Sequence, residues 1–211
     1  MKTRRKFIRT VGLTSAGLLA AGVSSKAAKA GICDACHTGH TCDKPATVQD
    51  VRMAARHFAM LYFHVCKTWV EAVGEEAAFP LVRKVIFELS LDRSDQIRAK
   101  ALAQGLEPAT GNFAAVNDLP VIGWDGWDPA SGGDRCPYAE AWLKYMDEYP
   151  WFKRFASMYC DVIDTTNVEN YTRTTSHRIT RNVLWGDAAC EREFFESEQV
   201  KQGVFTYGKR S

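Results

Sequence analysis

The second half of the chain carries cysteines and carboxylates at a spacing that suits thiol chemistry. Cys160 and Asp164 are four residues apart in a stretch with helical periodicity, so their side chains share one helix face. Asn167 follows in the same motif. A carboxylate beside a thiol can handle the proton in nucleophilic catalysis, although its charge raises the thiol pKa unless a cation is near. We therefore take Cys160 and Asp164 as the first candidates for catalysis.

Two more cysteines sit beside polar or turn-forming residues and are expected to reach the same site. Cys136 follows an arginine, and Cys190 follows a Gly-Asp turn that contains Asp187, a second candidate acid. The required cation can come from a segment expected to be a strand, which holds Arg173, His177, Arg178 and Arg181. The alternative for any single cysteine is a plain core position, because free cysteine is among the most buried residue types.

A separate cysteine and histidine cluster lies nearer the N-terminus. Cys33, Cys36 and His37 form the C-x-x-C-H signature of c-type haem attachment, with His40 and Cys42 just beyond. Three thiolates and an imidazole within ten positions also suit zinc or iron in a tetrahedral site. The third interpretation is an exposed tail whose thiols pair as a disulfide.

Residues 1–30 have the pattern of a twin-arginine signal peptide. Arg4 and Arg5 precede an uncharged, apolar run over residues 11–23, which is shorter than the roughly 20 residues that span a bilayer. Ala28-x-Ala30 then offers a small-x-small cleavage site. The sequence predicts export by the twin-arginine translocase to the periplasm; an uncut signal anchor is the alternative.

The charge balance changes once that signal is removed. The chain has 27 basic and 25 acidic residues, but residues 1–30 hold seven of the basic ones and none of the acidic ones. The remaining 20 basic and 25 acidic residues give a formal charge of −5. This argues against binding to nucleic acid, and nothing after the cleavage site suggests a membrane segment. All seven cysteines remain, and their odd number leaves at least one outside any set of disulfides.

Helical periodicity dominates the first part of the remaining chain, and strand patterns come last. Thr47 can cap a helix whose apolar positions continue to Val73, Gly74 ends it, and a second helix runs from Glu75 towards Gly105. Helical patterns return over 137–149 and 151–163 after a long loop, and strand patterns follow over 168–185 and 190–195. We predict an α+β fold with N-terminal helices packed on a small C-terminal antiparallel sheet. The predicted organisation is a signal at 1–30, a cysteine- and histidine-rich segment at 31–46, and a domain at 47–211.

Three motifs resemble the L-2-amino-thiazoline-4-carboxylic acid hydrolase family. They are Arg-Cys-Pro-Tyr-Ala-Glu at 135–140, Tyr-Cys-Asp-x-x-Asp-x-x-Asn at 159–167 and Gly-Asp-x-x-Cys at 186–190. A weaker likeness extends over 62–100, where the matching helical segment is 70–77. The resemblance implies a hydrolase that opens a five-membered C–N/C–S heterocycle, with a small molecule as substrate. The segment at 31–46 and the export signal are not part of that family's core.

The residues permit two hydrolytic routes. In one, the thiolate of Cys160 or Cys136 attacks the amidine-like carbon while Asp164 or Asp187 handles protons. In the other, cysteines and His177 hold a metal-bound hydroxide. A further set of side chains is expected to bind the substrate, with an arginine pairing with its carboxylate: Arg173, Arg178, His177 and Asn167.

Two functions of other kinds stay open. One is a non-catalytic exported redox, metal-binding or haem-binding protein that uses residues 33–42. The other is a ligand-binding sensor that keeps the pocket without the chemistry.

Overall fold

A long helical hairpin opens the part of the chain that the computed structural model describes, which is residues 46–119 and 136–209. Helix α1 (Val48–Val73) begins at Thr47, where a capping box joins the threonine and Asp50. Gly74, at φ 82°, ends α1 and lets α2 (Glu75–Ala103) start at once in a new direction. Both boundaries agree with the prediction from the sequence.

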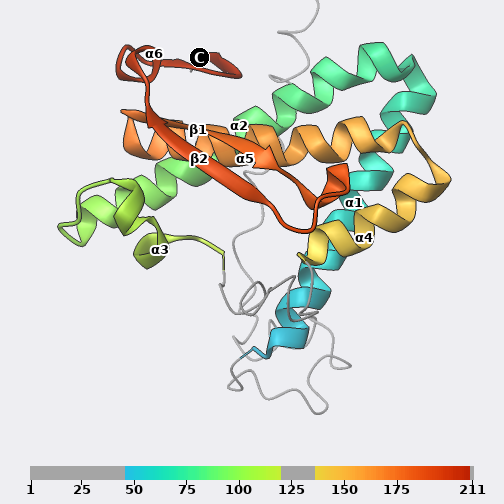
Figure 1. The fold of residues 1–211 in the computed structure, drawn as a ribbon, viewed down its shortest axis with the longest axis horizontal. Coiled ribbons are helices and arrows are strands. Elements are labelled where there is room, and N and C mark those ends of the chain that lie inside the picture. The colour runs from blue at the N-terminus through green and yellow to red at the C-terminus, as the bar shows by residue number, and fades with distance from the viewer. Residues whose placement is uncertain (1–45, 120–135, 210–211) are drawn as a thin grey trace, which may run out of the picture. The chain divides into compact units, whose positions relative to one another are not determined.

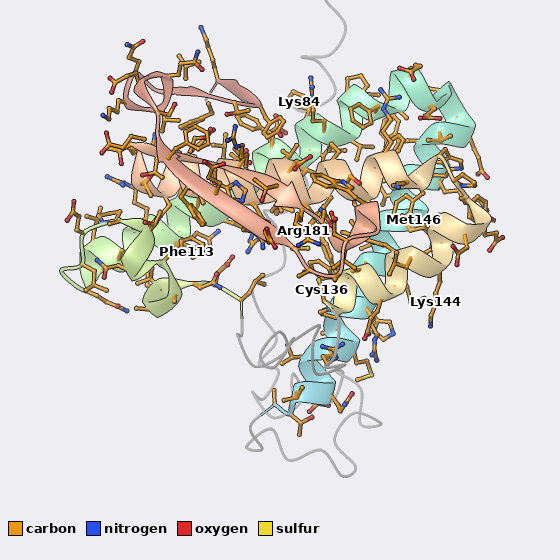
Figure 2. The ribbon with its side chains drawn as sticks, in the orientation of Figure 1. Lys84, Phe113, Cys136, Lys144, Met146 and Arg181 are labelled. Carbon is orange, nitrogen blue, oxygen red and sulfur yellow. The ribbon has the colours of Figure 1, made fainter. Side chains whose placement is uncertain are left out.

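Helix α5 is the central element of the domain. It runs over Phe152–Thr172, packs along α2, and carries strand β1 (Thr175–Arg181) on another side (Figure 1). Helix α4 (Pro137–Glu148) starts with proline at its first position and packs on α1. Figure 2 shows Cys136 at the start of α4, while Lys84 and Lys144 extend outward from α2 and α4.

The strands form two small antiparallel pairs. Strand β1 pairs with β2 (Glu191–Glu196), with His177 opposite Phe194 and an irregularity between Ile179 and Arg181. Strands β3 (Val204–Phe205) and β4 (Gly208–Lys209) make a short hairpin after α6 (Glu198–Lys201). Short helical turns fill the connections: η3 (Thr110–Asn112), α3 (Phe113–Val116) and η6 (Val183–Trp185).

One strand prediction is corrected. Residues 168–172, which are rich in β-branched and aromatic side chains, belong to α5 and not to the strand. The Thr172 hydroxyl donates a hydrogen bond to the Val168 carbonyl 2.9 Å away, a bond that keeps the last turn helical. Arg173 then ends the helix in the left-handed conformation at φ 65°, and β1 begins only at Thr175.

Aromatic side chains from α1, α4 and α5 make the main core. Trp142 is completely buried, and its indole N–H donates to the Ala59 carbonyl at 2.9 Å. The Tyr62 hydroxyl donates to the Phe155 carbonyl, also at 2.9 Å, so neither large polar group is buried without a partner.

The arrangement of these elements confirms the predicted fold class: the domain is mostly helical, with small C-terminal antiparallel sheets packed on the helices. In the stretches 46–119 and 136–209, no helix combines the length and the apolar character needed to cross a bilayer.

Candidate functional site

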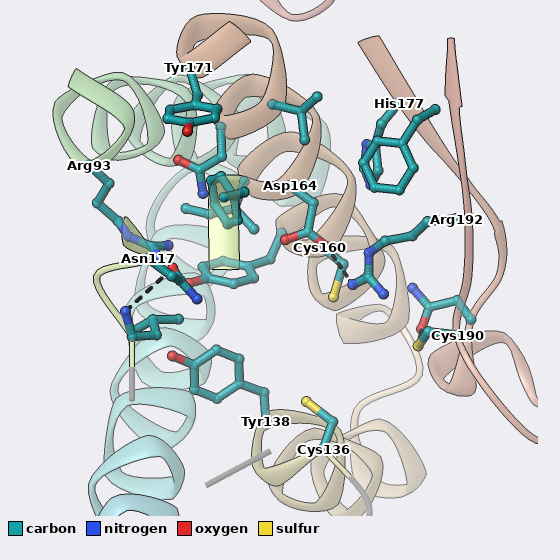
Figure 3. A pocket seen from close by; sticks show the side chains of 18 of the residues that line it. Arg93, Asn117, Cys136, Tyr138, Cys160, Asp164, Tyr171, His177, Cys190 and Arg192 are labelled. Carbon is teal, nitrogen blue, oxygen red and sulfur yellow. Dashed lines mark hydrogen bonds and ion pairs between the residues drawn. The ribbon is translucent and has the colours of Figure 1, made fainter. Parts of the chain in front are cut away.

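A cavity of about 670 Å³ lies against one face of α5. That face contributes Cys160, Asp164, Asn167 and Tyr171, at intervals of four, three and four residues. Because a helix rises about 1.5 Å per residue, these side chains line a wall about 16 Å long. The start of α4, the β1–β2 pair and the η3–α3 segment supply other walls (Figure 3). This volume is within the range typical of small-molecule sites.

Three cysteines from separate elements line this cavity. Cys160 comes from the middle of α5, Cys136 from the residue before α4, and Cys190 from the residue before β2 (Figure 3). The Cys190 thiol donates to the side-chain oxygen of Asn182, with 3.7 Å between sulfur and oxygen. The cavity thus brings together the three thiols that the sequence motifs placed in one site.

An ion pair lies beside the Cys160 thiol. The Arg192 Nη2 atom is 2.7 Å from Oδ2 of Asp164, one helical turn after Cys160 (Figure 3). No motif in the sequence singled out Arg192. Its position was readable, because Arg192 is two residues after Cys190 in an alternating segment and so belongs on the same face of the strand. The cation that the thiol site requires therefore comes from β2.

Burial dominates the electrostatics of Cys160. The pKa of its thiol is raised well above the usual value, first by burial and then by the charges of Asp164, Cys136 and Cys190. Arg192 acts in the opposite direction and lowers the pKa. The resting group at neutral pH is accordingly a thiol, and a nucleophilic role requires that its proton leave as the reaction proceeds.

His177 is a buried residue of the cavity wall, and its imidazole contacts a threonine hydroxyl. The residue is only 3% exposed, and its Nδ1 atom lies 3.0 Å from the hydroxyl oxygen of Thr165. That hydroxyl is also 3.3 Å from the His177 carbonyl oxygen, and in the tautomer in which it donates there, Nδ1–H donates to the hydroxyl oxygen and Nε2 is unprotonated. Burial lowers the pKa of His177, with Asp164 opposing and Arg192 adding to the shift. A neutral ring with an unprotonated Nε2 can accept a proton.

Several buried polar atoms at the cavity have no hydrogen-bond partner within the described ranges. They are Nε2 of His177, Oδ1 of Asn167, the hydroxyl of Tyr171 and Nδ2 of Asn182. Buried polar groups are normally paired, since an unpaired one costs about 1–3 kcal/mol. All four atoms are almost inaccessible to solvent in this structure, so a polar ligand would pair with one of them only after a neighbouring side chain moves.

Flat aromatic surfaces close the end of the cavity near Cys136. Tyr138 and Trp142 lie with ring centroids 5.5 Å apart, and Tyr159 lies 5.2 Å from Trp142. Burial raises the pKa of Tyr138 to about 12, so its phenol is neutral at physiological pH. No motif in the sequence singled out these residues for a site. A planar ring can pack against Tyr138, which is the partly exposed one of the three.

The structure places three predicted site residues away from the cavity. Asp187 accepts a hydrogen bond from the Asn182 N–H at 2.9 Å and thereby closes the turn before β2. Arg178 alternates with His177 along β1, points to the opposite face, and pairs with Glu193 at 2.6 Å on the surface. Arg173 ends α5 and lies 3.7 Å from Asp95. The structure therefore does not bring these three side chains to the cavity that holds Cys160.

The N-terminal cluster lies outside the described residues. The prediction of a haem or metal site therefore stays a prediction for the following five residues: Cys33, Cys36, His37, His40 and Cys42. Within residues 46–119 and 136–209, no group of three or more histidine, cysteine or acidic side chains is arranged to hold a metal ion.

Comparison with known proteins adds no assignment. No protein-family model, curated protein or solved structure matches this chain. The function is therefore argued from the residues of the cavity and their geometry.

Proposed function

We propose that the domain is a thiol-dependent hydrolase that opens the ring of a 2-amino-thiazoline carboxylate or a closely related cyclic amidine. The observation that carries the proposal is the position of Cys160 on the cavity wall, with Asp164 one turn away on the same helix face. The motifs around Cys136, Cys160 and Cys190 resemble those of hydrolases of such rings, and the cavity gathers these three residues.

The first step is attack by Cys160 on the amidine-like carbon between the ring nitrogen and the ring sulfur. As the new C–S bond forms, the thiol proton passes to Asp164. The bond from this carbon to the ring sulfur then breaks, and the departing sulfur takes the proton from Asp164. The result is an isothiourea carried on Cys160. The raised pKa of the Cys160 thiol makes this coupling of proton loss to attack necessary.

Water completes the reaction. A water molecule adds to the isothiourea carbon while Nε2 of His177 accepts one of its protons. The carbon–sulfur bond to Cys160 breaks, and the proton returns to the leaving thiolate. The product is the ring-opened carbamoyl compound, which equals the substrate plus one water. The buried, neutral imidazole of His177 supports this assignment, because only that form can accept the proton.

The walls of the cavity suit a small planar substrate. Tyr138 offers a partly exposed aromatic face at the end near Cys136, against which a five-membered ring can pack, and the buried Trp142 ring lies behind it with 5.5 Å between the centroids. The unpaired oxygen of Asn167 can accept an N–H from the substrate's amino group once its side chain turns toward the cavity. These contacts would hold the ring while its reactive carbon faces the thiol.

Turnover of 2-amino-thiazoline-4-carboxylate by the full chain tests the proposal. We expect mass spectrometry to detect the ring-opened product, and Cys160→Ala to lower kcat/KM by at least about 1000-fold. Cys66→Ala is the matched control, because Cys66 is a fully buried core cysteine that does not line the cavity. Near-normal turnover by Cys160→Ala would remove the thiol from the mechanism.

One observation favours a second function, which is ligand binding without chemistry. The Cys160 thiol is protonated at rest, and each candidate catalytic group can also hold a ligand by hydrogen bonds. Under this alternative, the wild-type protein and Cys160→Ala would bind the aminothiazoline alike, and neither would consume it. The assay above therefore separates the two functions.

We also propose that the domain works in the periplasm after export by the twin-arginine translocase. The support is the sequence pattern of residues 1–30, with Arg4, Arg5 and the site at Ala28-x-Ala30. The intact mass of the protein isolated from its compartment reports both cleavage and any haem attached at Cys33 and Cys36.

A further inference from the structure

The residues assigned to the reaction leave the substrate's carboxylate without a partner. Two arginines line the cavity, Arg93 from α2 and Arg192 from β2, and both carry an ion pair. The two arginines differ in how many guanidinium N–H groups are hydrogen-bonded to the partner carboxylate. That difference decides which one can receive another carboxylate.

Arg93 is already engaged through the forked side of its guanidinium. Its Nε and Nη2 atoms donate to the two oxygens of Asp118, at 2.7 and 2.8 Å. This two-point pairing is the strongest arrangement that an arginine and a carboxylate form. A second carboxylate would have to displace Asp118, so Arg93 is a poor receptor.

Arg192 is engaged at one point only. Its Nη2 atom donates to Oδ2 of Asp164, and within the described residues its Nε and Nη1 groups have no protein acceptor. Its side chain is 40% exposed, whereas that of Asp164 is 31% exposed. Asp164 therefore fixes the direction of the guanidinium and leaves the rest of its N–H groups available to a ligand.

The position of Arg192 places such a ligand beside the thiol. Arg192 and Cys160 both border Asp164, one through the ion pair and the other through the adjacent turn of α5 (Figure 3). Cys190, two residues before Arg192, lines the same end of the cavity. If a ligand's carboxylate binds Arg192, the ligand atoms next to that carboxylate therefore lie in the part of the cavity that Cys160 lines.

We propose that Arg192 is the binding residue of a carboxylate subsite next to Cys160, and that the cavity selects small electrophiles bearing one carboxylate. The proposal deepens the function above and rests on it for the role of the thiol. Arg192 and Asp164 together carry no net charge, so a single carboxylate gains the remaining hydrogen bonds of Arg192. A ligand with further negative charge would face Asp164 at close range.

A pair of alkylating reagents tests the subsite. Iodoacetate carries a carboxylate, and iodoacetamide is its neutral counterpart of nearly the same size. In either case the cysteine sulfur bonds to the CH₂ carbon, iodide leaves and the thiol proton is released. Rate constants for labelling of Cys160 in the folded full chain are measured by peptide mapping, which separates Cys160 from Cys136 and Cys190.

We expect the ratio of the iodoacetate rate to the iodoacetamide rate at Cys160 to fall at least about tenfold in Arg192→Gln. Any change in thiol pKa or access affects both reagents and cancels in the ratio. Arg178→Gln is the matched control, because Arg178 lies on the paired strand and has its own carboxylate partner, Glu193, but is outside the cavity. It should leave the ratio unchanged.

Arg192→Lys keeps the charge without the forked donors and should give an intermediate ratio. It also provides the test if Arg192→Gln does not fold.

An unchanged ratio in the Arg192 variants, or no labelling of Cys160 by either reagent, would overturn the subsite. A protein that shows the preference but does not hydrolyse the aminothiazoline would keep the subsite and lose the proposed reaction. If hydrolysis depends on Cys160 but Cys160 shows no preference for iodoacetate over iodoacetamide that depends on Arg192, the proposed reaction stands and the subsite is overturned.

Discussion

Two carboxylates on adjacent turns of α5 have opposite surroundings. Asp164 has Arg192 at 2.7 Å, whereas Asp161 is half-buried and has no ion pair to an arginine or lysine among the residues that the structure describes. Burial, and then the charge of Asp164, raise the pKa of Asp161 to about 6. An acid whose pKa is higher in the folded state destabilises that state once it ionises.

Asp161→Asn should therefore stabilise the protein at neutral pH. The unfolded carboxyl ionises near pH 3.8 and the folded one near 6, so wild-type stability falls as pH rises between these values and stays lower above them. Asparagine has no charge to bury. Thermal unfolding should give the variant a higher Tm than wild type at pH 7.5, with the gap closing near pH 4.

Asp92→Asn controls for the removal of a charge, because Asp92 lies on an exposed part of α2. A gap of the same size in Asp92→Asn, or no gap in Asp161→Asn at pH 7.5, would contradict the assigned cause.

Sequence spacing located part of the candidate site at this scale. The interval between Cys160 and Asp164 placed both on one helix face, and the cavity lies along that face. The same argument from spacing, applied to a strand that starts near Cys190, would have placed Arg192 on the same strand face as Cys190. Arg178 was misplaced because strand alternation puts it on the face opposite His177, and the exact start of β1 decides which of the two points inward.

Among the secondary-structure elements, Glu169 connects α5 to both sheets. This fully buried carboxylate accepts hydrogen bonds from the Ser176 hydroxyl at 2.5 Å, the Thr206 N–H at 2.9 Å and the Thr206 hydroxyl at 2.5 Å. One side chain thus joins α5 to β1 and to the turn between β3 and β4. No apolar residue could satisfy these three donors.

Glu169→Ala should lower the free energy of unfolding by about 1–3 kcal/mol, because it leaves the buried Ser176 hydroxyl and two partly buried donors of Thr206 without their acceptor. Glu169→Gln should cost less, because its carbonyl oxygen still accepts. Glu193→Ala on exposed β2 removes only a surface ion pair and should cost under about 1 kcal/mol. Urea unfolding measures all three, and equal losses in Glu169→Ala and Glu193→Ala would contradict the assignment.

Local signals predicted most helix boundaries but not the end of α5. Thr47 and Gly74 act through their own side chain or backbone, so their effects are visible in the sequence. The Val168–Thr172 segment has β-branched residues, yet it stays helical because α5 packs along α2 over its length. Tertiary packing of this kind overrides local propensity, and a single sequence does not display it.

For the molecule as a whole, the cavity depends on segments that are distant in the chain. Cys136, Cys160 and Cys190 come from three elements, and Arg93 arrives from a fourth. The sequence indicated that the thiols belong together only through motif resemblance and the polar residues beside them. Their meeting at one cavity follows from how α2, α4, α5 and β2 pack, which no local pattern encodes.

The central claim is that the Cys160 thiol performs chemistry inside this cavity. Its most direct test is to alkylate the wild-type protein in steps with iodoacetamide and to follow aminothiazoline hydrolysis together with labelling of each cysteine. We predict that activity falls in proportion to the labelled fraction of Cys160 and reaches zero when labelling is complete. Full activity in protein whose Cys160 is completely labelled would contradict the claim.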